Sequence, residues 1–152
     1  MKSRIWIGLI AAIALPVFAQ DGGNAVNFSA QKMVIDQNAM LTELIGSAQL
    51  TRGKLSMNAE HIYVYSVKSG ESGQKFDHLE AKGGVNAKTG NQTITSSNMS
   101  YDANTEIAVF SGDVVVKQGS NVARAQKAVL NIQTGIYTLS GPVKGVITGT
   151  LP

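Results

Sequence analysis

The chain has 152 residues, a formal net charge of +3 at pH 7 and no cysteine. This length suits one domain of ordinary size, and the lack of cysteine excludes a small scaffold held by disulfides. Without Lys2 and Arg4, 13 − 2 = 11 basic residues face 10 acidic residues. Such a nearly neutral chain gives no reason to expect a nucleic-acid partner.

Residues 1–19 have the layout of a secretory signal peptide. Lys2 and Arg4 precede an apolar run at 5–15, and Val17 and Ala19 stand at the −3 and −1 positions of a small-residue cleavage site. The run is too short, and too closely followed by that site, to favour a membrane-spanning helix. We therefore expect Sec-type export, cleavage after Ala19 and one domain over 20–152, with retention of the run as an anchor as the alternative.

The rest of the sequence repeats one unit with a glycine at each end of a short alternating segment. The glycine pairs are Gly46 and Gly53, Gly83 and Gly90, and Gly112 and Gly119. The period is 29 residues from Gly83 to Gly112 and from Gly112 to Gly141, but 37 from Gly46 to Gly83. The eight extra residues fall in the polar segment 66–75, which predicts a longer hairpin loop. A half unit at 28–35 precedes the three units, and a closing half unit begins at Ser140.

Within each unit, apolar residues alternate with polar ones, which is typical of strands with one buried face. Turn-forming sequences separate these strands, at 51–54, 88–91 and 117–121 on one side and at 36–39, 102–105 and 132–135 on the other. Residues 121–132 have some helical spacing, but they occupy the same repeat positions as other strands. The sequence predicts an all-β protein of about a dozen or more short antiparallel strands.

The buried positions predicted by this alternation are mainly aliphatic. The residues that we expect to face inward are Leu50, Met57, Ile62, Val64, Val85, Ile94, Met99, Phe110, Val114, Val116 and Leu130. Several inward neighbours are very small, among them Ala48, Ala59 and Ser96. Small residues allow two sheets to pack closely, but they also suit a slim apolar trough for acyl chains, and the sequence leaves both explanations open.

No set of reactive side chains predicts an enzyme. His61 and His78 are the only histidines and lack the spacing of metal ligands. Asp36 and Asp102 occupy one repeat position, which indicates a shared turn-capping role rather than acid–base catalysis. No G-x-S-x-G motif is present. We expect no catalytic residue, no cofactor and no metal site.

The segments 44–65, 81–102 and 109–132 carry the repeated pattern of glycine, alternating apolar residues and glycine. In this pattern the chain resembles the LptA/OstA-like family of periplasmic lipopolysaccharide-transport proteins. The resemblance implies a periplasmic location and a twisted, open β-jellyroll of stacked strands. It also implies that the acyl chains of lipid A lie inside the fold and that the sugars face solvent.

The same resemblance implies partners at both ends of the jellyroll. These are an LptC-like partner at the inner membrane, an LptD-like translocon at the outer membrane, and further copies joined head to tail. We expect the edge strands within 26–36 and 137–148, and their apolar residues are Phe28, Met33, Ile35, Tyr137, Leu139 and Val143. Two alternatives remain: a membrane-anchored LptC-like protein, and a structural solenoid of parallel 29-residue coils.

Overall fold

A computed structural model describes residues 25–148, and all regular secondary structure in this range is strand. Strands β1 to β10 span Val26–Ser29, Lys32–Asp36, Leu41–Arg52, Leu55–Ser69, Gly73–Thr89, Gln92–Asp102, Ile107–Gln118, Asn121–Asn131, Tyr137–Ser140 and Lys144–Val146. They form one antiparallel sheet in the order β1-β3-β4-β5-β6-β7-β8-β10, with β2 beside β3 and β9 beside β8. The described residues contain no helix long and apolar enough to cross a membrane. The predicted signal peptide lies outside the described range.

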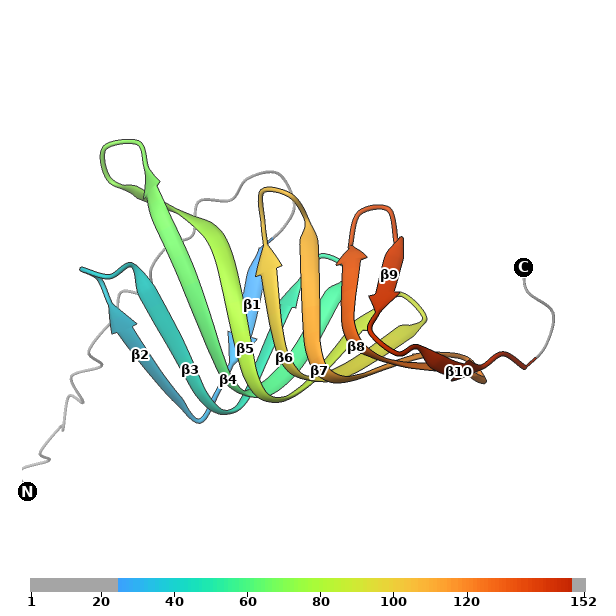
Figure 1. The fold of residues 1–152 in the computed structure, drawn as a ribbon. Helices are drawn as coiled ribbons and strands as arrows, with labels where there is room; N and C mark the ends of the chain where they lie inside the picture. Colours follow the sequence, from blue (N-terminus) through green and yellow to red (C-terminus); the bar gives the residue numbers. More distant parts are fainter. Residues whose placement is uncertain (1–24, 149–152) are drawn as a thin grey trace, which may run out of the picture.

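Each of the six central strands bends once, and the aligned bends fold the sheet into a V (Figure 1). The bends coincide with register shifts, such as the shift between Ile45 and Ala48 of β3. We call the two sides of the V its arms. The upper arm consists of β2, β9 and residues 41–45, 61–69, 73–82, 98–102, 107–111 and 127–131. The lower arm consists of β1, β10 and residues 48–52, 55–58, 85–89, 92–95, 114–118 and 121–125.

The glycines that open the repeats lie at these bends, where the backbone has positive φ angles. Gly83 has a φ of +83°, and a Cβ atom added to it would lie 2.7 Å from the Cβ of Glu60 on β4. Only a residue without a side chain fits such a conformation and such a close approach. The second glycines, Gly53, Gly90 and Gly119, lie instead in the hairpin turns.

The predicted all-β class is confirmed, but the number and length of the strands are not. Residues 25–148 form ten strands, and the six central ones are 11 to 17 residues long because each continues through its bend. Segment 66–75 is not a loop: Ser66 to Ser69 pair with residues 73–76 of β5, so only residues 70–72 form the turn. Residues 121–131 form strand β8, as expected.

The capping role predicted for two aspartates is confirmed. Asp36 Oδ1 accepts hydrogen bonds from the backbone N–H groups of Asn38 and Ala39, at 2.9 and 3.0 Å. Asp102 Oδ1 does the same for residues 104 and 105. Asn131 caps the equivalent turn of the next unit through the N–H of Thr134. The repeat therefore preserves its turns as well as its bends.

Candidate functional site

The candidate site is the apolar trough between the two arms. All eleven residues predicted to face inward are at most 3 % exposed, and they belong to one cluster to which both arms contribute. Because the side chains alternate along each strand, the inner face of both arms is apolar over most of its length. The inward parity read from the repeat is therefore correct, while its role in binding lipid stays a prediction.

Very small side chains gather where the two arms converge. Ala48 and Ala59 are paired across β3 and β4, directly beside the bend, and Ser96 and Ala125 take the equivalent places on β6 and β8. All four are at most 7 % exposed. Larger side chains there would force the arms apart, so close packing explains these residues at the bend. Farther from the bend, large inward side chains are paired with small ones, as Phe110 is with Ala128 and Leu130 with Ala108.

The trough is filled by its own side chains in this structure. Ile62, Ile94, Phe110 and Leu130 are all 0 % exposed, so no water-sized space adjoins them. An acyl chain can therefore enter only if the arms separate or these side chains move aside. Control of that separation then lies at the open side of the V, where the two arms end in hairpin turns.

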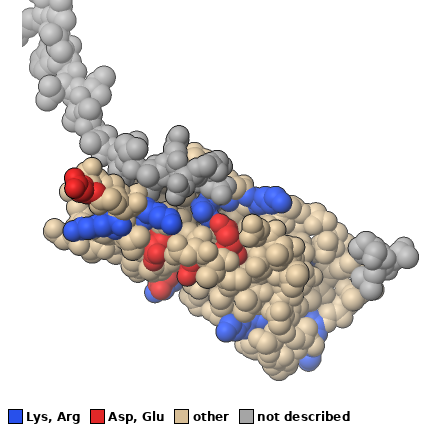
Figure 2. Space-filling model, turned by 90° about the horizontal axis from the view of Figure 1, so that it is seen from above, with Lys and Arg blue, Asp and Glu red and all other residues tan. Residues whose placement is uncertain are grey.

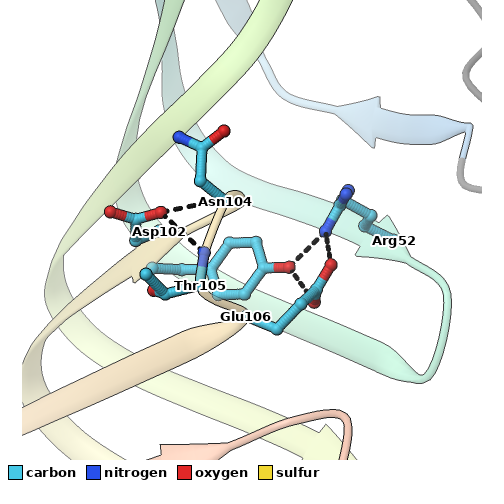
Figure 3. Close-up of polar contacts among 6 residues, drawn as sticks. Arg52, Asp102, Asn104, Thr105 and Glu106 are labelled. Atoms are coloured by element: carbon cyan, nitrogen blue, oxygen red, sulfur yellow. Dashed lines mark hydrogen bonds and ion pairs between the residues drawn. The ribbon is translucent and has the colours of Figure 1, made fainter.

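Four side chains cross this open side and join the arms; we call Arg52, Phe76, Tyr101 and Glu106 the mouth cluster. Arg52 ends β3 in the lower arm, whereas the other three lie in the upper arm and its turns. Arg52 Nη1 lies 3.1 Å from Glu106 Oε1 and also donates to the Tyr101 hydroxyl, which donates to Glu106 Oε2 (Figure 3). The Arg52 guanidinium lies 5.4 Å from the Phe76 ring centre and 5.5 Å from that of Tyr101.

The mouth cluster was not predicted, because Arg52 is 49 residues from Tyr101 and 54 residues from Glu106 in sequence. One signal was nevertheless present in the alternation. Arg52 follows Ala48 and Leu50 with the same parity, so a charged residue occupies an inward position. A long cation at the inner edge of a strand needs a partner, and the opposite arm supplies it.

Burial sets the protonation of the mouth cluster. Desolvation raises the pKa of the Tyr101 hydroxyl well above its ordinary value of 10.0, and its hydrogen bond to Glu106 raises the pKa further. Arg52 acts in the opposite direction, but the two raising effects prevail. Tyr101 therefore stays a neutral hydrogen-bond donor over the physiological range.

This raised pKa predicts a loss of stability in alkali. Above pH 10 the unfolded chain releases the Tyr101 proton while the folded chain keeps it, so the free energy of unfolding falls with rising pH. We expect Tyr101→Phe to flatten this fall by up to about 1.4 kcal/mol per pH unit. Urea unfolding at pH 9, 10 and 11 measures it for both proteins. Equal slopes for the two proteins would contradict this assignment.

The residues predicted at the edges lie at both ends of the trough. Phe28 and Met33, on β1 and β2, and Tyr137 and Leu139, on β9, are partly buried and pack against the core. Ile35 on β2 is exposed, and Val143 lies between β9 and β10 rather than in a strand. Val143 falls outside the ladder because the chain bends there, between Gly141 and the start of β10.

The outer surface carries the scattered polar groups. A hollow of about 400 Å³ on the upper arm is lined by His78, Leu79, Glu80, Ser100, Tyr101, Asp102, Thr105, Ile107 and Val109. His78 stacks on Tyr65 and lies 2.7 Å from Asp77, and the contact with Asp77 is the main cause of the lowered pKa of Asp77.

Residues 25–148 contain no group of three potential metal ligands. Seen from above, charged side chains gather toward the N-terminal end (Figure 2).

The fold and the trough define a class of protein: a β-jellyroll, open at both ends, with an apolar interior. A family model described as "LptA/(LptD N-terminal domain) LPS transport protein" matches residues 27–136. The chain therefore belongs to this family of lipopolysaccharide-transport proteins, and the predicted resemblance is confirmed.

Solved structures agree with this fold. The chain is similar to LptH of Pseudomonas aeruginosa, which is described as the LptA homologous periplasmic component of the conserved lipopolysaccharide transport device. The TM-score is 0.68 at 14 % sequence identity, over 82 % of this chain and 96 % of that chain. A comparison with curated proteins returns no match.

Proposed function

We propose that the chain is a non-enzymatic carrier that binds lipopolysaccharide in the periplasm, with the acyl chains of lipid A between its two arms. The observation that carries this proposal is the continuous apolar face shared by both arms, which converge at the bends and meet at the mouth cluster. Membership of the lipopolysaccharide-transport family and the periplasmic description of LptH support it.

The energetics of lipid transfer favour such an enclosure. Exposing acyl chains to water costs about 0.8 kcal/mol per CH₂ group, so a lipid with several chains needs cover throughout its path across an aqueous compartment. A folded sheet with two apolar inner faces supplies that cover without any covalent step. The sugars of the lipid would remain outside, beyond the mouth.

We further propose that the chain bridges an LptC-like partner and an LptD-like partner, or further copies of itself, through its free edges. Within residues 25–148, the outer edges of β1 and β2 at one end, and of β9 and β10 at the other, pair with no further strand. Unpaired strand edges recruit further strands by backbone hydrogen bonds. Exposed apolar side chains near these edges, including Val34, Val146 and Ile147, support pairing there.

Photocrosslinking at two adjacent valines of β7 tests the interior site. Val116 is 3 % exposed and faces the trough, whereas Val115 faces outward on the lower arm. A photoreactive amino acid at position 116 should capture lipopolysaccharide from vesicles, and the same group at position 115 should capture little. Capture at 115 but not at 116 would rule out transport of acyl chains through the interior.

A further inference from the structure

A small hollow lies beside the mouth cluster, between the ends of the two arms. It has a volume of about 250 Å³ and is lined by Arg52, Gly53, Lys54, Glu106, Ile132 and Gln133. Arg52 ends β3 in the lower arm, and Gly53 and Lys54 form the turn that follows it. The other three come from the β6–β7 and β8–β9 turns of the upper arm. The hollow therefore sits where a lipid in the trough would change from acyl chains to its polar group.

The charges around this hollow suit an anion. Arg52 and Lys54 bring two cations to it, and Lys54 has no acidic side chain within 4.0 Å among residues 25–148. Arg52 is only 15 % exposed and is held by its contacts with two aromatic rings, so its planar fork is already oriented. A guanidinium in this state binds phosphate oxygens in pairs.

The lower arm adds further positive charge around the hollow. Its strands and hairpin turns carry six basic residues and no aspartate or glutamate. The basic residues are Arg52, Lys54, Lys88, Lys117, Arg124 and Lys144. Asp113 lies in the bend, and the other acidic residues of the described range lie in the upper arm, its turns and its side of the bend. This excess of basic residues on the lower arm raises the local concentration of anions along its edge of the open side of the V.

Glu106 is the present partner of Arg52, and a phosphate group would compete for the same cation. Among the ion pairs of residues 25–148, Arg52–Glu106 alone joins the two arms, because the other two lie within the upper arm. A phosphate monoester carries about −1.5 to −2 charges at pH 7, against one on a carboxylate. An anion that takes Arg52 therefore removes a link across the mouth.

We propose that this hollow is a phosphate-binding site and that phosphate binding releases the mouth cluster, so that the arms separate and the trough accepts acyl chains. The assignment to a lipid phosphate, that of lipid A, rests on the proposed function. The chemistry itself requires only a phosphate group, so a free phosphate ion is the other possible source.

A first experiment measures loading of the purified chain with lipid A that carries its phosphates and with lipid A from which they have been removed enzymatically. We expect phosphorylated lipid A to load about tenfold faster, the ratio expected for one charge-assisted contact. Arg52→Gln should abolish this preference. Glu106→Gln should load either lipid about tenfold faster than the unchanged chain, because the ion pair that links the two arms is then missing.

Glu80→Gln is the matched control for Glu106→Gln. Glu80 pairs with Lys82 at 3.7 Å on the outer surface of the upper arm and makes no ion pair with Arg52. The same chemical change there should leave loading unchanged. A similar acceleration by both variants would show a general charge effect and overturn the proposal.

A second experiment follows the opening itself. The chain has no cysteine, so the double variant N91C/T105C places one spin label in a turn of each arm without background labelling. Phosphorylated lipid A should lengthen the distance between the labels, and R52Q in the same background should remove the change. A distance unaffected by phosphorylated lipid A would overturn the release of the mouth cluster.

The outcomes separate this inference from the proposed function. If the unchanged chain loads neither form of lipid A, the proposed function fails. If it loads both forms equally well, and E106Q behaves as the unchanged chain does, lipid binding stands and the phosphate site is wrong. The third measurement adds millimolar inorganic phosphate instead of lipid. If inorganic phosphate opens the mouth and phosphorylated lipid A does not, the assignment to the lipid is overturned.

Discussion

Replacing Leu50 by aspartate should unfold the domain. Leu50 lies on the inner face of β3 and is 1 % exposed, between Phe28 of β1 and Met57 of β4 in the ladder. A carboxylate at this position would lose its hydration without gaining a partner, at a cost of several kcal/mol. Domains of this size have only about 5–15 kcal/mol of stability in total. We expect the loss of the cooperative thermal transition seen by circular dichroism in the unchanged chain.

Thr51→Asp is the matched control, because residue 51 is the next residue of the same strand and is exposed. It should change the free energy of unfolding by about 0.5 kcal/mol or less, as surface substitutions usually do. A transition retained by Leu50→Asp at an unchanged temperature would show that the interior is open to water. The apolar trough would then be wrong as a description of the ground state.

The second large effect is expected at a bend of the sheet. Gly83→Ala combines an unfavourable φ of +83° with a Cβ atom 2.7 Å from the Cβ of Glu60, and this neighbour belongs to the adjacent strand. Backbone strain of this kind costs about 1–3 kcal/mol, and overpacking adds a similar amount. We expect the free energy of unfolding to fall by about 3 kcal/mol or more, measured by urea denaturation.

Gly84→Ala separates the two causes, since Gly84 also has a positive φ, +72°, but an added Cβ would meet nothing within 4 Å. Its cost should therefore be the backbone strain alone, about 1 kcal/mol. Equal losses for Gly83→Ala and Gly84→Ala would mean that the close approach between β4 and β5 does not matter. The bend would then depend on backbone conformation only.

Much of the fold could be predicted by aligning the repeat units, because each turn and each inward position recurs at the same place in several units. The second glycines located the turns and the alternation located the inward face, whereas the first glycines set the period of the repeat without revealing the bends at which they lie. The aspartates at equivalent repeat positions located the capped turns. Each of these features depends on residues close together in sequence, where local spacing determines the geometry.

What could not be predicted depends on contacts between distant residues. Strand continuity through a bend leaves no punctuation in the sequence, so each bent strand was counted as two short ones. The extra residues at 66–75 are polar and rich in Gly and Ser, yet they pair with each other and lengthen a hairpin. The mouth cluster depends on how far one arm leans over the other, a property of the whole sheet rather than of any segment.

Each end of the described sheet, over residues 25–148, has two edge strands that belong to different arms: β1 and β2 at one end, and β9 and β10 at the other. A partner sheet that pairs with both strands at one end must match the angle between them. Docking would then fix the angle between the two arms and so set the width of the trough at that end. Assembly and cargo capacity would be mechanically linked through the same bent sheet.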